Sequence, residues 1–289
     1  MKASERMSKG RRAALKTSAM GLVALSLPSL AMTNEKVHNK PLGTAYNTIP
    51  DHFPNIDPEI VLEVVGKSHS NLERVKELVD KRPELARSVW EWRFGDFESA
   101  IGAASHVGRR DIVQYLMGKG ARPTIFTFAM MGAHDVVKSM IEYSPGLQKT
   151  MGPHGISLLD HAYYGERMKD KMTHTEIDNL KKTIDYLESL GDAGGETYME
   201  ETAEEQERYL GDYKYGEGEK EGFTIALNMA QKMALGPIGG FGGALFKVED
   251  NLYIYNGAPS VTVSFETQNN TITSLTLRSP DATITATKI

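Results

Sequence analysis

The spacing of apolar side chains divides the chain into a helical part and a β part. Over residues 57–193, apolar residues recur three and four positions apart, which predicts a series of helices. Residues 194–208 are acidic and predict a linker or a short helix. Over 209–289, apolar and polar residues alternate, and Asn256-Gly257 and Asn269-Asn270 can form turns. We therefore expect a small antiparallel β domain built from two hairpins.

Residues 99–121 have the features of one complete unit of two helices. Ala103 and Ala104 are small enough for a helix to approach its neighbours, Gly108 allows a tight turn, and Gly120 ends the second helix. Three apolar residues of that second helix are expected to face a core: Ile112, Val113 and Leu116. The segment resembles an ankyrin repeat along its whole length.

Weaker copies of this unit occur before and after it. The equivalent positions Val75, Val113, Val137 and Ile184 lie 38, 24 and 47 residues apart, whereas a regular ankyrin array repeats at about 33. The resemblance implies a fold of the α+β multidomain class. An ankyrin-type helical solenoid of about four irregular units over 57–193 is followed by the antiparallel β domain.

The β domain carries a second, looser resemblance. It opens on the aromatic pattern Tyr209-Leu210-Gly211-Asp212-Tyr213 and closes on alternating apolar residues that end in Ala-x-Lys-Ile. This sequence pattern is similar to that of a domain of unknown function appended to some exported serine-hydrolase-like bacterial proteins. That domain has no assigned catalysis, so the resemblance implies no active site.

The first 31 residues have the layout of a secretory signal. A basic start precedes an apolar run of roughly a dozen residues, and Ser29 and Ala31 suit a cut after Ala31. Four residues resemble the twin-arginine export pattern: Arg11, Arg12, Leu15 and Lys16. We expect residues 1–31 to be removed, residues 32–56 to form a linker or arm, and the mature protein to be periplasmic or otherwise exported, without a membrane span. The alternative is an uncleaved anchoring helix.

The amino-acid composition excludes several kinds of site and partner. The chain has no cysteine, which excludes disulfides, thiolate metal sites and cysteine nucleophiles. The formal net charge is −5, and the first 31 residues carry six basic side chains and one acidic one, so the remainder carries −10. An acidic chain is a poor ligand for nucleic acid phosphates, and we expect no nucleic acid partner.

The residues that could serve catalysis or metal binding do not form a recognisable site in the sequence. His154, His161 and His174 contain no pair at the spacing of zinc ligands on a helix, so no metal site and no cofactor are expected. Ser157, Asp160 and His161 are close in sequence, but on one short helix their side chains point in different directions. The sequence contains no Gly-x-Ser-x-Gly motif. We therefore predict that the protein is not an enzyme.

The most interesting candidate surface lies just before residues 99–121. Trp90, Trp92, Arg93 and Phe94 occupy the place of an ankyrin finger, and such residue types are enriched in interface hot spots. Packing of the tryptophans into the core is the alternative. The resemblance implies a non-catalytic protein-binding module of the cell envelope or periplasm, with a protein partner of unknown identity. Two alternatives stay open: an accessory or immunity-like subunit of an exported enzyme, or a binder of a small ligand or glycan through the β domain.

Overall fold

The computed structural model describes residues 49, 51–228, 231–240 and 242–289. The export signal predicted at Arg11, Arg12, Leu15 and Lys16 lies outside these residues, as does most of the arm predicted over 32–56. Residues Pro50–Ile289 belong to one compact unit. Within the part of the chain that is described, no helix combines the length and the apolar character needed to cross a membrane.

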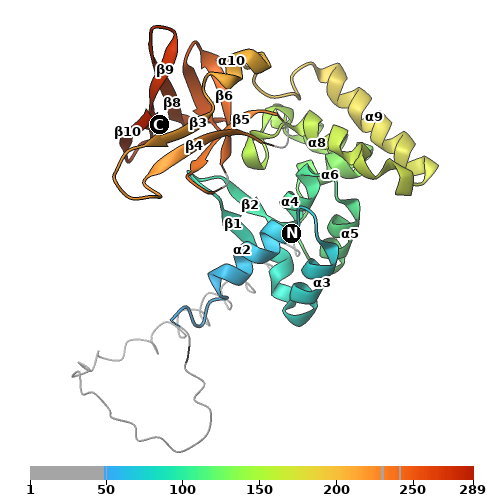
Figure 1. Ribbon diagram of the computed structural model, residues 1–289. Helices are drawn as coiled ribbons and strands as arrows, with labels where there is room; N and C mark the ends of the chain where they lie inside the picture. The colour runs from blue at the N-terminus through green and yellow to red at the C-terminus, as the bar shows by residue number, and fades with distance from the viewer. Residues whose placement is uncertain (1–48, 50, 229–230, 241) are drawn as a thin grey trace, which may run out of the picture. The chain divides into compact units, whose positions relative to one another are not determined.

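The first part of this unit is helical (Figure 1). Its α-helices are α2 (Pro58–Lys67), α3 (Leu72–Lys81), α4 (Ala100–His106), α5 (Arg110–Gly118), α6 (Ile125–Met131), α7 (His134–Tyr143), α8 (Leu158–Tyr164), α9 (His174–Leu190) and the short α10 (Ala203–Glu207). Its 3-10 segments are η1 (Pro83–Arg87), η2 (Leu147–Lys149), η3 (Pro153–Gly155) and η4 (Gly165–Lys171).

Polar side chains fix where the helices begin. The side chains of Asp57, Asn71 and Ser99 accept hydrogen bonds from backbone N–H groups in the first turns of α2, α3 and α4. Thr173 and Glu176 form a reciprocal capping box at the start of α9. These local signals explain why the helices start as the apolar spacing indicates, and the prediction that Ile112, Val113 and Leu116 are buried is confirmed.

The predicted ankyrin-type solenoid followed by a small β domain is wrong. A solenoid buries one continuous core as its units stack, whereas the buried helical residues here fall into two clusters. One cluster is formed mainly by α2 to α5 and the other by α6 to α9. The connections are also unequal and include four 3-10 segments, which matches the unequal spacing of the units in the sequence.

A two-stranded ribbon lies between η1 and α4. Strand β1 (Val89–Glu91) pairs antiparallel with β2 (Phe97–Ser99), and Trp90 lies opposite Glu98. Because side chains alternate along a strand, Trp90 and Glu98 share one face of the ribbon, and Val89, Phe97 and Ser99 share the other. The two faces of the β1–β2 ribbon therefore have different neighbours in the structure.

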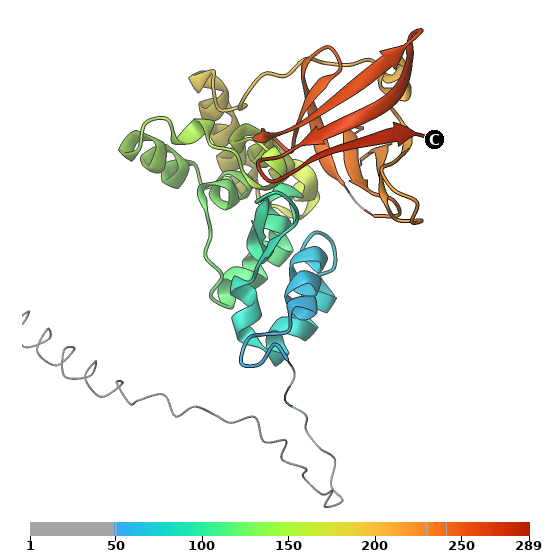
Figure 2. The ribbon, with the colours of Figure 1, turned by 90° about the vertical axis from the view of Figure 1, so that its left-hand side faces the viewer.

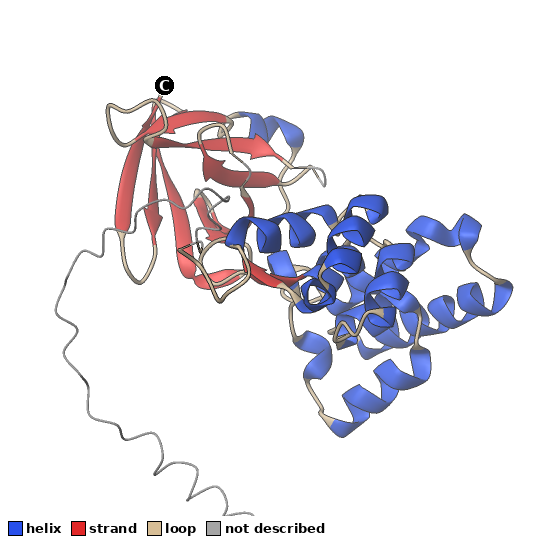
Figure 3. Ribbon diagram, turned by 90° about the horizontal axis from the view of Figure 1, so that it is seen from below, coloured by secondary structure: helices blue, strands red, loops and turns tan. Residues whose placement is uncertain are grey.

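The β part is a closed barrel, which corrects the expectation of two hairpins (Figure 2). Its strands are β3 (Gly211–Lys214), β4 (Gly222–Leu227), β5 (Met233–Pro237), β6 (Gly243–Glu249), β7 (Leu252–Tyr255), β8 (Ala258–Gln268), β9 (Thr271–Arg278) and β10 (Thr283–Lys288). Each strand pairs antiparallel with the next, and β10 pairs with β3 to close the ring. Figure 3 shows most of the strands gathered on one side and most of the helices on the other.

Side chains fill the barrel, as expected for eight strands. On β8, Val261, Val263 and Phe265 are buried, whereas the residues between them are only half-buried. Tyr213 and Tyr253 are also completely buried, and the Tyr213 hydroxyl donates to the Tyr209 carbonyl oxygen at 2.7 Å. The interior is thus a packed aromatic core.

Candidate metal centre

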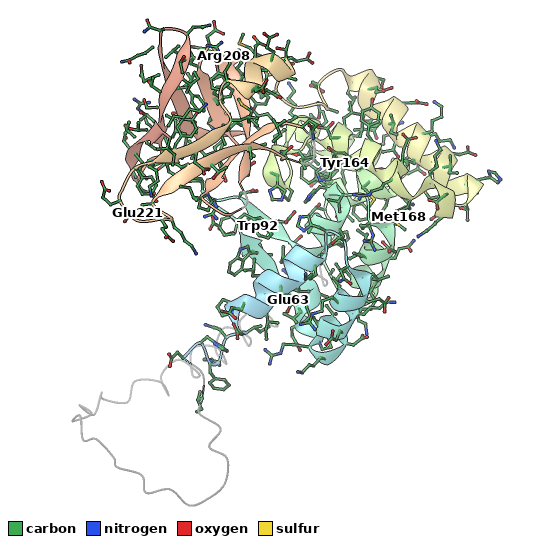
Figure 4. The ribbon with its side chains drawn as sticks, in the orientation of Figure 1. Glu63, Trp92, Tyr164, Met168, Arg208 and Glu221 are labelled. Atoms are coloured by element: carbon green, nitrogen blue, oxygen red, sulfur yellow. The ribbon has the colours of Figure 1, made fainter. Side chains whose placement is uncertain are left out.

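A buried carboxylate, that of Glu98 on β2, is the centre of the most unusual polar cluster in the described residues. Its side chain has no exposed surface. The indole Nε1 of Trp92 donates a hydrogen bond to Glu98 Oε2 at 2.7 Å, and Figure 4 labels Trp92 beside the β1–β2 ribbon. Burial of a carboxylate is costly unless positive charge or several donors compensate it, so the groups around Glu98 decide what the cluster can bind.

Three histidines surround this carboxylate. His69 lies in the turn after α2, His106 is the last residue of α4, and His154 lies in η3. His106 Nδ1 is 2.9 Å and His154 Nε2 is 3.3 Å from Glu98 Oε1, and His69 Nε2 is 3.4 Å from Glu98 Oε2. When each of the four residues offers one ligand atom, all four atoms lie within 4.8 Å of one another. The chain folds so that four separate segments meet at one point.

The three contacts between the histidines and Glu98, at 2.9–3.4 Å, are close to the separation of ligands that share one ion. Two ligand atoms that are each about 2.0–2.1 Å from a tetrahedral zinc ion lie about 3.4 Å apart. His106 Nδ1 and Glu98 Oε1 are close, yet neither atom has a hydrogen-bond partner among the described residues. Each of the two atoms can therefore offer an electron pair to an ion. In a tetrahedral site every pair of ligand atoms is about 3.4 Å apart, so binding would have to draw together the pairs that are up to 4.8 Å apart here.

Hydrogen bonds on the outer side of two histidines orient them toward the cluster. His154 Nδ1 is 2.7 Å from Asp96 Oδ2, and the His154 backbone N–H donates to Asp96 Oδ1 at 3.0 Å. His69 Nδ1 is 3.0 Å from the Gly66 carbonyl oxygen. When Nδ1 carries the proton of these hydrogen bonds, Nε2 is free to bind a metal, and such outer partners are typical of metal-ligating histidines.

The pKa shifts in the cluster favour an ionised carboxylate beside a protonated histidine. Burial raises the pKa of Glu98, but the close contacts of His106 and His154 outweigh burial and hold that pKa well below its ordinary value. Burial lowers the pKa of His154, but its hydrogen bond to Asp96 and its close contact with the Glu98 carboxylate outweigh burial and raise the pKa to about 10. Burial lowers the pKa of His69. Without an ion, a proton on His154 therefore offsets one of the two carboxylate charges that contact it.

Asp96 also connects this cluster to the barrel. The side-chain amide of Asn256, in the turn between β7 and β8, donates from Nδ2 to Asp96 Oδ2 at 2.8 Å. The same Asp96 oxygen accepts from His154, so one carboxylate is held by groups from both parts of the unit. The orientation of His154 thus depends on the contact between the ribbon and the barrel turn.

We expect Asp96→Asn to weaken metal binding by about 10- to 100-fold, because loss of a carboxylate that orients a ligating histidine typically has that effect. Competition of the purified variant against a fluorescent zinc chelator measures the change. Asp135→Asn is the matched control, since Asp135 contacts His134 at 2.9 Å outside the cluster. Equal zinc affinity of the Asp96 variant and the unmodified protein would contradict the orienting role.

The four residues predicted to contact a partner are not equivalent in the structure. Trp90 is half-buried and packs on the first helical core, and Trp92 is half-buried with its indole directed at Glu98. Arg93 is exposed. Phe94 is 42% exposed and makes an edge contact with Tyr255 at 5.1 Å between ring centroids. Partner binding by these residues stays a prediction.

His69, Glu98 and His106 were not predicted as ligands, because they do not lie at helical spacing in the sequence. The ligands come instead from two turns, one helix end and one strand. One signal was present: His69 and His106 both lie where the first helix of a helix pair ends, so packing of adjacent pairs can bring them together. Their ring centroids are 4.9 Å apart. No protein-family model matches the chain, and no curated protein matches it.

Proposed function

We propose that this protein binds one divalent transition-metal ion, with zinc as the best-fitting ion, through His69, Glu98, His106 and His154. The observation that carries the proposal is the convergence of their four ligand atoms within 4.8 Å, around a carboxylate with no exposed surface. Three imidazoles and one carboxylate are a ligand set that suits zinc.

Charge balance supports a divalent ion. A dication bound by neutral histidines and the Glu98 carboxylate has a net charge of one, and Asp96, hydrogen-bonded to His154, neutralises it. The absence of cysteine leaves imidazole nitrogens and oxygens as the available ligands. Such a set favours zinc and similar first-row ions over softer ions that prefer thiolates.

The arrangement supports a structural role for the ion. Four protein ligands complete a tetrahedral site, whereas catalytic zinc sites keep one position open for water or substrate. Two cavities lie beside Asp96, with volumes of about 180 and 470 Å³, and none of the four ligands lines either of them. The ion would join the turn after α2, strand β2, the end of α4 and segment η3.

The test is the zinc content of the full chain. The protein is stripped with a chelator, incubated with a small excess of zinc, separated from free metal and analysed by mass spectrometry of the metal. We expect one zinc per chain, and far less in Glu98→Gln and in His106→Ala. His174→Ala is the matched control, because His174 is an exposed histidine at the start of α9. Zinc contents that are the same in all four proteins would contradict the proposal.

A further inference from the structure

A second buried pair of charged groups lies where the segment before the barrel contacts strand β6. The Met199 backbone N–H donates to the Lys247 carbonyl oxygen at 3.0 Å, which attaches this segment to the barrel. The Glu201 and Lys247 side chains are only 7% and 8% exposed, and Glu201 Oε1 accepts a hydrogen bond from the Tyr253 hydroxyl. Because side chains alternate along a strand, Lys247 shares a face of β6 with Leu245, which belongs to the barrel core. Lys247 is therefore an inward-facing lysine.

The ammonium group of Lys247 has hydrogen-bonding positions that the protein does not fill. Nζ is 3.9 Å from Glu201 Oε1 and 3.5 Å from Asp250 Oδ1, and both distances exceed those of ordinary hydrogen bonds. An ammonium group has three N–H donors. Among the described residues, the side-chain atoms that lack both a hydrogen bond and solvent access are Glu98 Oε1, His106 Nδ1 and His161 Nε2. Lys247 Nζ is not one of these atoms, so it is accessible to a ligand.

Lys247 and Glu201 line one cavity. Its volume is about 460 Å³, within the range of small-molecule sites. Lys247 also lines a second cavity of about 360 Å³, so open space lies on two sides of this residue. Tyr198 and Phe246 pack together in the wall of the first cavity, with 4.7 Å between their ring centroids. The first cavity thus combines aromatic surface with two charged groups whose side chains are largely buried.

The charges in the wall of the first cavity favour an uncharged ligand. Three glutamates and two lysines line it: Glu196, Glu200, Glu201, Lys232 and Lys247. An anion would meet more negative than positive side chains, and a cation would meet the Lys247 ammonium group. A neutral polar ligand avoids both kinds of repulsion.

The distance between the two buried charged groups selects the functional group of the ligand. Lys247 Nζ and Glu201 Oε1 are too far apart for a direct hydrogen bond, but one oxygen atom can lie about 2.8 Å from each of them. This oxygen has to accept a hydrogen bond from the ammonium group and donate one to the carboxylate. A hydroxyl group does both. A sugar ring carries several hydroxyl groups together with apolar C–H surface.

We propose that this cavity binds a neutral sugar ring, and that one hydroxyl group of the sugar accepts from Lys247 Nζ and donates to Glu201. The C–H surface of the ring packs beside Tyr198 and Phe246, and other hydroxyl groups meet the polar part of the wall, which includes Gln206. The inference does not depend on the metal centre, because none of the four metal ligands lines the cavity.

The first test is an NMR titration of the full chain with the methyl pyranosides of glucose, galactose, mannose and N-acetylglucosamine. We expect at least one of them to bind, with shifts of backbone amide resonances concentrated in residues 198–206 and 245–250. Lys247→Met should weaken this binding at least tenfold, because a hydrogen bond from a charged donor is lost. Lys220→Met is the matched control, since Lys220 is exposed and does not line the cavity, and it should bind like the unmodified protein.

A measurement on the unmodified protein covers the case in which Lys247→Met does not fold. Analogues of the bound sugar that each lack one hydroxyl group are titrated in turn. One analogue should bind at least tenfold more weakly, because it cannot bridge Lys247 and Glu201. The proposal would be overturned by binding of none of the sugars, by shifts confined to other parts of the chain, by unchanged affinity in Lys247→Met, or by equal affinity of all the deoxy analogues.

Discussion

Zinc is expected to raise the thermal unfolding midpoint of the metal-free protein by about 8–16 °C. The ligands come from four segments between His69 and His154 and converge only in the folded chain, so the ion binds the folded state in preference to the unfolded state. At a free zinc concentration about a thousandfold above the dissociation constant, this linkage stabilises the fold by about 4 kcal/mol. In a domain of this size, each kcal/mol corresponds to about 2–4 °C.

Differential scanning calorimetry with and without zinc measures this shift. Glu98→Gln and His106→Ala should lose most of the zinc-dependent increase, and the exposed-site control His174→Ala should keep all of it. Addition of a chelator should return the unmodified protein to its metal-free midpoint. A zinc-dependent increase that is equally large in Glu98→Gln would assign the stabilisation to binding elsewhere on the chain.

Gly108→Ala is expected to destabilise the protein by about 2–5 kcal/mol, through backbone strain and overpacking together. Gly108 lies in the turn between α4 and α5 with φ +71°, a conformation that favours glycine. An added Cβ would lie 2.0 Å from the carbonyl oxygen of Tyr164, a residue labelled in Figure 4. Because that oxygen belongs to the backbone, the end of α8 would have to move.

The matched control for this change is Gly120→Ala. Gly120 has φ +86°, but no atom lies within 4 Å of the added Cβ. We expect it to show only the conformational cost of about 1–2 kcal/mol. Urea denaturation of both variants at saturating zinc compares the two free energies of unfolding. If the two variants lost equal stability, the close approach of Gly108 to Tyr164 would not contribute.

The sequence predicted the local structure of the helices better than it predicted the closure of the β-barrel. Apolar spacing correctly identified the buried face of α5, and Gly108 and Gly120 have the positive φ angles that helix-ending glycines require. The barrel could not be predicted in this way. The residues of β5 read Met-Ala-Leu-Gly-Pro without alternation, and closure depends on β10 pairing with β3, far away in the sequence.

The candidate metal centre could not be predicted from the sequence for a related reason. Spacing rules find ligands that share one helix or one turn, but Glu98 comes from a three-residue strand and His154 from a 3-10 turn with φ +61°. The position of Glu98 on the inward face of the ribbon depends on its register with Trp90. The ankyrin resemblance places a finger at these residues, but it does not give the register of the two strands.

A crystal structure of the zinc-loaded protein, with diffraction data collected on both sides of the zinc absorption edge, tests the central claim most directly. We predict one anomalous peak, about 2.0–2.2 Å from His69 Nε2, a Glu98 carboxylate oxygen, His106 Nδ1 and His154 Nε2. A zinc-loaded crystal with no anomalous peak among these four side chains would contradict the account.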